Sequence, residues 1–457
     1  MKKTSRVLKT GIALLLVFSL VGLPSVTCSA AAAVKAASAQ DVNYVIGNAY
    51  AGVDWDSWQG YKTQLHCHSN VSDGDVPLNE VIEEHYALGY DILSVTDHMT
   101  LGTAWDVAPE AVELMRLIKK DRTGMLPITP LTSERREQII NGVGRDGRGM
   151  LEITTGIELN GAVPSNSHVN GYFANYGQGL IGIDGDYETP IKEFHNRGGI
   201  TFLDHLGNYT EAYSKNDPSI SSDPFYVNKF SRIFLDYSSC LGMGLASGTD
   251  THTTYDRILY DNILKTTIPY GVVPWSFTFS DAHSPGQFDR AYTVHWMPEL
   301  TVDAFRDSME DGTFFSYSQY ARWEIADEFV GEGAAPEVNR ITVDEDADTI
   351  TVEAENYDEI TWVSDGEIIA KGATIDLDDY SDDVGCYVRA YLTGPGGVLF
   401  VQPFTTEIDG TTLDRASVPD TVDYSRIIRI IITLLNSIIA EDSIIRTGWE
   451  ALKHLDF

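Results

Sequence analysis

Between about Tyr44 and Tyr320, short apolar segments alternate with helical ones, and this alternation is the strongest constraint on the fold. Strand–helix–strand repeats of this kind favour a parallel α/β architecture. The predicted helices are each followed closely by a glycine that can end a helix, and they are Pro77–Leu88, Thr189–Arg197 and Thr301–Glu310. The predicted strands are Tyr61–His68, Asp91–Val95, Ile153–Leu159, His168–Phe173, Ile200–Leu203 and Trp275–Phe279.

After a Gly/Ala/Pro-rich linker near 331–336, the pattern changes to short runs of alternating, β-branched residues. Tight turns at 364–366 and 394–397 separate neighbouring runs, as in β-hairpins. Residues 337–410 are therefore predicted to form a small all-β sandwich of immunoglobulin-like type, with Cys386 as a buried free thiol. Residues 40–330 would form the α/β domain before it, with an insertion at 102–149 over one face.

The two ends of the chain carry different signals. Residues 1–39 are typical of a secretory signal peptide, with basic residues, an apolar run at Gly11–Val21 and small residues after it. The mature protein is therefore expected outside the cell or at the cell surface. Residues 411–457 are predicted to be a helical, apolar tail that packs on the body of the protein. Peripheral attachment to a membrane or self-association through the tail is the alternative.

The charge of the chain limits its partners. Acidic residues outnumber basic ones 67 to 32, which gives a net charge of -35. A surface of this sign repels phosphate backbones, so sequence-independent binding to nucleic acid is not expected. Once the signal segment and its Cys28 are removed, only three cysteines remain, too few for a disulfide framework in a chain of this length.

Histidines and acidic residues gather at the ends of the predicted strands. His66 and His68 lie two positions apart, so both imidazoles should leave the same face of a strand while Cys67 points away. The carboxyl ends of strands in a β/α fold converge, and histidine and carboxylate side chains there could bind borderline divalent metals. The further candidates of this kind are Asp73, Asp97, His98, Glu158, His168, His205, Asp281 and His283.

The other histidines are interpreted differently. His85 and His195 lie on amphipathic helices and are expected to face solvent. His295 lies in a strand pattern with no acidic partner. Asp250-Thr251-His252 imitates a ligand pair, but no clear strand precedes it, so these residues are expected to be structural or exposed.

The ordered set of strand-end residues resembles the PHP family, named for polymerase and histidinol phosphatase, and within it the secreted, carbaryl-hydrolase-like branch. The resemblance covers roughly residues 60–320 and implies a distorted (β/α)7 barrel with a trinuclear metal site. It rests on His66-Cys67-His68, Ser72-Asp73-Gly74, Thr96-Asp97-His98, Gly156-Ile157-Glu158, His168, His205 and Ser280-Asp281-Ala282-His283. It implies one metal on His66, His68, Glu158 and Asp281, a second on Glu158, His168 and His205, and a third on Asp73, His98 and His283.

The same resemblance implies a metal-dependent hydrolase, in the first place a phosphoesterase acting on a small molecule, with two or three divalent ions (Zn, Mn or Fe). Glu158 would bridge two cations, which lower the pKa of a water so that hydroxide is available near neutral pH. Asp281 and His283 share the catalytic role with Glu158. Asp97 is expected to orient His98 or another ligand, or to cap a loop.

Several questions stay open at this point. Arg257 and Arg290 are candidates for binding a substrate phosphate, with an exposed salt bridge as the alternative for each. The same site could instead hydrolyse a carboxyl ester, a carbamate or an amide, because these reactions also pass through an oxyanion. A non-catalytic surface or binding protein with structural metals is a third reading. The number of ligands and the shared carboxylate argue against it.

Overall fold

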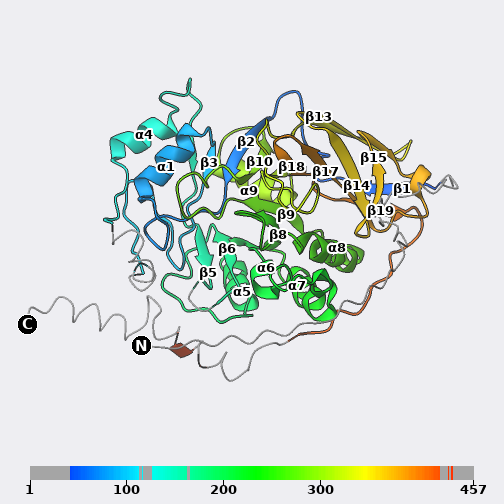
Figure 1. The fold of residues 1–457 in the computed structure, drawn as a ribbon, viewed down its shortest axis with the longest axis horizontal. Coiled ribbons are helices and arrows are strands. Elements are labelled where there is room, and N and C mark those ends of the chain that lie inside the picture. Colours follow the sequence, from blue (N-terminus) through cyan, green and yellow to red (C-terminus); the bar gives the residue numbers. More distant parts are fainter. Residues whose placement is uncertain are drawn as a thin grey trace, which may run out of the picture. The chain divides into compact units, whose positions relative to one another are not determined.

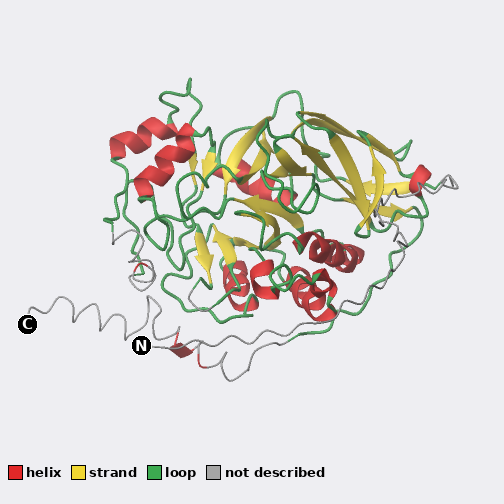
Figure 2. Ribbon diagram, in the orientation of Figure 1, coloured by secondary structure: helices red, strands yellow, loops and turns green. Residues whose placement is uncertain are grey.

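The computed structural model describes residues 42–112, 116, 126–161, 165–421, 431, 434 and 435. The predicted signal peptide and most of the predicted tail therefore lie outside the described residues. Within them the chain has a mixed α/β fold, with helices and strands interleaved along the sequence (Figures 1 and 2). None of the helices in the described part of the chain is long and apolar enough to cross a membrane.

The predicted helices are present with boundaries shifted by one residue. The N-cap Thr301 accepts a hydrogen bond from the backbone N–H of Ala304, and Gly312 ends the same helix in the left-handed conformation. The helices are α1 (Leu78–Ala87), α4 (Ser133–Ile140), α5 (Glu188–Asn196), α6 (Gly207–Thr210), α7 (Pro224–Asp236), α8 (Asp256–Thr267) and α9 (Val302–Asp311).

One sheet has five strands in sequence order, β5 (Ile157–Leu159), β6 (Val169–Tyr172), β7 (Ile200–Leu203), β8 (Cys240–Ser247) and β9 (Trp275–Phe279). β7, β8 and β9 are parallel, as the alternation predicts. β6 is antiparallel to both of its neighbours, which corrects the all-parallel expectation. The segment between β5 and β6 is too short for a helical crossover, so the chain returns in the opposite direction.

The second sheet has 11 strands, and at one of its ends β2 (Gln59–Gln64), β3 (Ile92–Leu93) and β4 (Leu151–Glu152) are parallel neighbours. These strands and the five-stranded sheet do not join into one closed ladder in the described part of the chain, so the (β/α)7 barrel is not confirmed. β3 and β4 are only two residues long and offer little edge for pairing. Single bridges, Cys67 to Ala282 and His98 to Glu158, connect the two sheets instead.

The β-rich region after residue 336 shares the larger sheet. β2 pairs with β10 (Ala291–Met297), and β10 pairs with β11 (Phe314–Ser318). β11 pairs with β18 (Gly397–Phe400), and all three pairings are antiparallel. β1 (Tyr44–Gly47) pairs with β19 (Phe404–Ile408). The other strands of this sheet are β14 (Glu359–Ser364), β15 (Glu367–Lys371) and β17 (Tyr387–Gly394).

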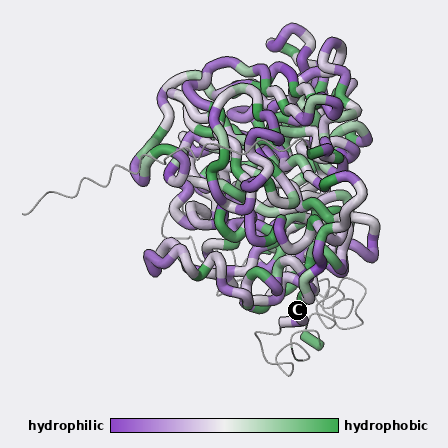
Figure 3. The backbone as a smooth tube through the Cα atoms, turned by 90° about the vertical axis from the view of Figure 1, so that its right-hand side faces the viewer, coloured by the Kyte–Doolittle hydropathy of each residue, from purple (hydrophilic) through white to green (hydrophobic). Residues whose placement is uncertain are grey.

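A separate three-stranded sheet contains β12 (Glu337–Asp344), β13 (Thr349–Glu355) and β16 (Thr374–Asp376). The fully buried Trp362 belongs to an apolar cluster formed by residues of both sheets. Cys386 is buried and free, as predicted. Figure 3 shows mostly hydrophilic outer loops, while many of the hydrophobic stretches lie inside.

A group of packed aromatic side chains supports the strand ends of the smaller sheet. The ring of Phe202 stacks on Phe277 with centroids 4.5 Å apart, and it also stacks on Phe279 at 5.5 Å. Phe279 in turn meets the edge of the His66 ring at 5.2 Å. The polar residues at the strand ends are therefore supported from below by tightly packed apolar side chains.

Candidate metal centre

The predicted ligands converge on one edge of the strands. The rings of His66 and His68 have centroids 4.9 Å apart, and Cys67 lies in an apolar cluster, so the alternation inferred for this segment holds. Because β6 is antiparallel, its beginning lies at the same edge as the carboxyl ends of its neighbours. His66 and His68 follow β2, His98 follows β3, Glu158 lies in β5, His168 precedes β6, His205 follows β7, and Asp281 and His283 follow β9.

Four groups of side chains have ligand atoms within 4.8 Å of one another. The groups are His66/His68/Asp281, His66/Glu158/Asp204/His205, His98/Glu158/His168, and His68/Asp73/His98/His283. The set implied for the third metal is thus brought together, with His68 added. The set implied for the second metal is divided, because His168 groups with His98 while His205 groups with Asp204.

Glu158 lies at the centre of these groups, and its two oxygens face different histidines. Oε1 lies 2.5 Å from His168 Nδ1 and 3.6 Å from His205 Nε2. Oε2 lies 2.6 Å from His98 Nδ1 and 3.4 Å from His68 Nε2. A carboxylate in this position can be shared between two cations, as the resemblance implies for Glu158.

Asp204 is a ligand candidate that the sequence reasoning missed. Its Oδ2 lies 3.2 Å from His66 Nε2, and its carboxylate also accepts a hydrogen bond of 2.7 Å from Asn170 Nδ2. It follows β7 directly and precedes His205, in the same Asp-His order as Asp97 and His98. Its place at a strand end was the signal that could have identified it.

The outer nitrogens of several rings are held by hydrogen bonds that fix the ring orientation. His168 Nε2 donates to the carbonyl oxygen of Ser165 at 3.0 Å, and His283 Nδ1 donates to that of Asp281 at 2.9 Å. His66 Nδ1 lies 2.7 Å from the hydroxyl of Thr96. In the neutral ring, a carbonyl acceptor holds the proton on the nitrogen that faces it, and the other nitrogen keeps the lone pair that can bind a metal.

Several buried polar atoms that point into the cluster lie close to one another but not in hydrogen-bonding geometry, so they have no hydrogen-bond partner among the described residues. Buried polar atoms in folded proteins are nearly always satisfied, so such a concentration indicates a missing partner. Histidine nitrogens together with carboxylate oxygens are the donor set that borderline divalent cations prefer. The residues therefore fit a group of metal ions. The atoms are His66 Nε2, His68 Nε2, His98 Nδ1, His168 Nδ1 and both side-chain oxygens of Glu158.

The electrostatics of the cluster are dominated by its carboxylates. Burial tends to raise the pKa of Glu158, but His168, His98 and His66 hold that pKa well below its usual value. Burial also tends to lower the pKa of His66, yet Asp204, Glu158 and Asp281 outweigh it and raise the pKa to about 9. Burial, helped by His283 and His98, lowers the pKa of His68 to about 3. The buried negative charge around His66 attracts cations, whether protons or metal ions.

Asp97 acts on the loop between His68 and Asp73. Its carboxylate is buried and accepts hydrogen bonds from Ser69 N at 2.9 Å, Ser69 Oγ at 2.7 Å and Ser72 Oγ at 2.6 Å. These contacts support the loop-capping alternative. Asp97 thereby positions the ligands on either side of that loop.

Three other residues lie in unexpected surroundings. Arg257 is buried, and its guanidinium pairs with Asp250 at 2.6 Å and with Glu324 at 2.9 Å, so it is neither an exposed salt bridge nor accessible to a phosphate. Arg290 is half-buried, with its guanidinium 5.9 Å from the Tyr320 ring centroid. The expectation for His85 is wrong, because it is fully buried against Tyr90 and Phe288.

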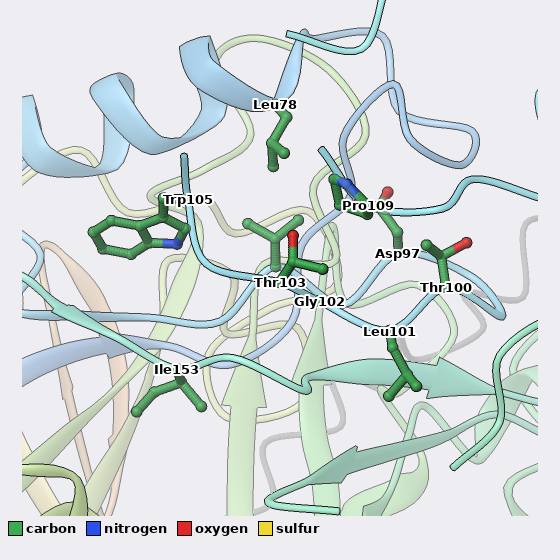
Figure 4. Close-up of a pocket in the computed structure, with 10 residues that line it drawn as sticks. Leu78, Asp97, Thr100, Leu101, Gly102, Thr103, Trp105, Pro109 and Ile153 are labelled. Atoms are coloured by element: carbon green, nitrogen blue, oxygen red, sulfur yellow. The ribbon is translucent and has the colours of Figure 1, made fainter. Parts of the chain in front are cut away.

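The candidate ligands differ in exposure, and the side chain of His168 is 14% exposed. The side chains of His283, Asp281 and Asp73 are 25%, 22% and 16% exposed, whereas those of His66, His68 and Glu158 are inaccessible. A cavity of about 20 Å³ lies beside Asp97, lined mainly by apolar side chains such as Leu78, Trp105 and Ile153 (Figure 4). It has room for about one water molecule, so it is not a substrate pocket. Among these candidate ligands, side-chain exposure is greatest at His283 and Asp281.

Comparison with known proteins gives no family model and no curated protein that matches the chain. Similar solved structures include a two-domain protein from Bacteroides vulgatus containing a predicted PHP-like metal-dependent phosphoesterase, with 15% identity, a TM-score of 0.37, and coverage of 81% of this chain and 95% of that one. An amidohydrolase from Chromobacterium violaceum with bound sulfate and no metal has 13% identity and a TM-score of 0.28 over 56% and 97% of the two chains. A lesion-specific endonuclease from Pyrococcus furiosus has 10% identity and a TM-score of 0.31 over 55% and 56%.

Proposed function

We propose that this protein is a metal-dependent hydrolase of the PHP type that cleaves small-molecule phosphoesters. The position of Glu158 carries the proposal. Its buried carboxylate has one oxygen at His168 and the other at His98, at 2.5 and 2.6 Å, and it belongs to two of the four ligand groups. A structural metal site has no need of a shared carboxylate or of so many ligands, whereas a hydrolytic multinuclear site uses both.

Each part of the cluster has a role in this proposal. His66, His68, Asp281, Asp204 and His205 would hold one side of the centre, and His168, His98, Asp73 and His283 the other, with Glu158 between them. Two or three divalent ions (Zn, Mn or Fe), when bound, would activate water near neutral pH and neutralise charge on the phosphoryl group. The chain keeps the carboxylates of Glu158, Asp73 and Asp281 ionised, shields Glu158 from bulk solvent and leaves Asp281 and His283 partly exposed. The parallel strands β2–β4 and the five-stranded sheet β5–β9 would together correspond to the distorted barrel of the PHP family.

The proposal extends to the setting of the enzyme. The N-terminal segment favours export, so the protein would act outside the cell or at its surface. The net charge of -35 makes a small ester a better substrate than a nucleic acid. The apolar tail would serve peripheral membrane attachment or self-association.

The first test combines elemental analysis of the purified protein with a substrate panel. We expect two or three divalent metals per chain. We also expect hydrolysis of an aryl phosphate that stops after chelation and returns when Zn, Mn or Fe is added. Hydrolysis confined to aryl carboxyl esters would favour the carboxyl-ester reading. A metal-loaded protein that is inactive on phosphomonoesters, phosphodiesters and carboxyl esters would indicate a binding protein instead.

The Glu158→Gln variant tests the bridging carboxylate directly. The amide keeps the size of the side chain but removes its charge, so we expect loss of at least one metal per chain and at least a 100-fold fall in kcat, since metal-centred catalysis depends on that charge. Glu193→Gln is the matched control, because Glu193 pairs with Arg197 on the surface of α5. Full metal content in Glu158→Gln would contradict the bridging role.

A further inference from the structure

The turn that follows β8 carries His252, which the sequence pattern indicated to be structural or exposed. The sequence showed no clear strand before Asp250-Thr251-His252, but β8 precedes them and is fully buried. β8 lies between β7 and β9 and runs parallel to both. Since the carboxyl ends of these neighbours lead to His205 and Asp281, His252 emerges at the same edge, between two residues of the metal centre.

A buried ion-pair network fixes this turn. Asp250 is fully buried with a φ of 61°, and its carboxylate accepts hydrogen bonds from Arg257 Nη1 at 2.6 Å and Thr253 Oγ1 at 2.7 Å. Thr253 Oγ1 accepts in turn from the backbone N–H of Ser247 at 3.1 Å. Charges buried in this way tolerate little movement, so the turn is a rigid support for His252.

The backbone of His252 packs directly against the segment that carries His205. A Cβ atom added to Gly207 would lie 1.5 Å from the carbonyl oxygen of His252, which shows how closely the two segments approach. Gly207 N also donates to Asp256 Oδ2 at 2.9 Å, just beyond the turn. His252 is therefore held next to a ligand segment by contacts of its main chain and not of its side chain.

The imidazole of His252 is exposed and makes no hydrogen bond or ion pair with any residue that the structure describes. Burial of part of the ring and the charge of His205 lower the pKa of His252, while Asp281 acts in the opposite direction. Asp281 is one of the more exposed ligand candidates of the cluster. The turn therefore brings His252 to the same edge as His205 and Asp281, whereas Arg257 is buried and paired with Asp250 and Glu324.

We propose that His252 is a substrate-binding residue of this centre, whose imidazole N–H donates a hydrogen bond to a phosphoryl oxygen of the bound ester. This inference rests on the proposed function and deepens it. The rigid turn supplies the position, the exposed ring has no hydrogen-bond or ion-pair partner among the described residues, and the partly exposed Asp281 lies at the same edge. His252 belongs to none of the four ligand groups, so its part is to orient the substrate and not to hold metal.

The test compares His252→Ala, His252→Gln and the parent protein, all loaded with metal. For His252→Ala we expect the KM for an aryl phosphate to rise about tenfold, kcat to change by less than about threefold and metal content to stay the same, as for the loss of one binding hydrogen bond. His252→Gln should recover most of the KM, because its amide can donate. His195→Ala, which removes an exposed histidine on α5, should match the parent.

A second readout does not need turnover. Calorimetric titration of the metal-loaded protein with inorganic phosphate should show about tenfold weaker binding to His252→Ala. Unchanged KM and phosphate affinity in an active His252→Ala protein would overturn the inference, and so would loss of metal, which would make His252 a ligand. If the parent protein itself hydrolyses no phosphoester and binds no phosphate, the proposed function fails first.

Discussion

At the scale of single residues, Asp204 differs from the other acidic groups of the centre. It is fully buried, and burial raises its pKa to about 6 although His66 and His205 act to lower it. Asp281, which is partly exposed, has its pKa held well below the usual value despite burial, chiefly by His66. Asp204 therefore needs a further positive partner more than Asp281 does, and a metal ion at the His66 side would supply it.

Replacing Asp204 with asparagine tests this requirement. The amide keeps the shape and the acceptor oxygen but removes the charge facing His66, so we expect metal content to fall by up to one ion per chain and activity to fall at least tenfold. Elemental analysis and aryl phosphate turnover measure the two effects. Asp217→Asn, which alters an exposed cap of a short 3-10 helix, is the control. Unchanged metal content would mean that Asp204 only orients His66.

The buried His295 should make the free energy of unfolding depend on pH. It is fully buried, and burial lowers its pKa to about 3, so it stays neutral in the native protein while its unfolded form takes up a proton below pH 6.5. Unfolding therefore takes up protons in acid, and stability is lost as pH falls from about 6.5 towards 3. The expected slope from this residue is about 1.4 kcal/mol per pH unit. Urea unfolding of the metal-free protein between pH 4 and 6 should show a slope smaller by one proton in His295→Gln, and an equal slope would refute the assignment.

At the scale of elements, the geometry of the candidate metal centre depends on closely packed loops. A Cβ atom added to Gly161, in the loop after β5, would lie 2.2 Å from His98 Nδ1. The Gly161→Ala variant should displace His98 from Glu158, so we expect weaker metal binding and at least a tenfold loss of activity with the fold preserved. Metal titration and circular dichroism measure this. Gly52→Ala is the control, since an added Cβ there meets nothing within 4 Å, and equal metal affinity in both variants would contradict the close approach.

The elements also show what local sequence can predict. The alternation of His66, Cys67 and His68, and the glycines that end helices, are local features, and the structure follows them. β8 was missed because its glycines at 242 and 244 weaken the strand pattern. Both positions need glycine, since an added Cβ would collide with Trp275 at 242 and with Phe279 at 244. His85 was misassigned because the residues that cover it, such as Phe288, come from a distant segment. Asp204 lies beside His66 only through packing of β2 against the smaller sheet.

At the scale of the whole molecule, the β-rich region is tied to the α/β region by a shared sheet and a buried ion pair. β18 pairs with β11, and β19 pairs with β1, so strands from both regions need one another for their hydrogen bonds. The guanidinium of Arg389 on β17 makes two 2.7 Å hydrogen bonds to Asp261 on α8, the helix that begins just after the His252 turn. The two regions should therefore unfold together, with metal release coinciding with loss of β structure.

Arg389→Met tests this coupling. It leaves the buried Asp261 without its charge partner, so we expect the free energy of unfolding to fall by about 3–5 kcal/mol in a single transition. Lys371→Met is the matched control, because Lys371 forms an exposed pair of 2.6 Å with Glu359, and such pairs contribute less than about 1 kcal/mol. Urea unfolding followed by circular dichroism and by a metal-sensitive dye measures both variants. Because the regions share a sheet, we expect metal release and loss of β structure to have the same urea midpoint. Metal release at a lower urea concentration than loss of β structure would contradict the coupling.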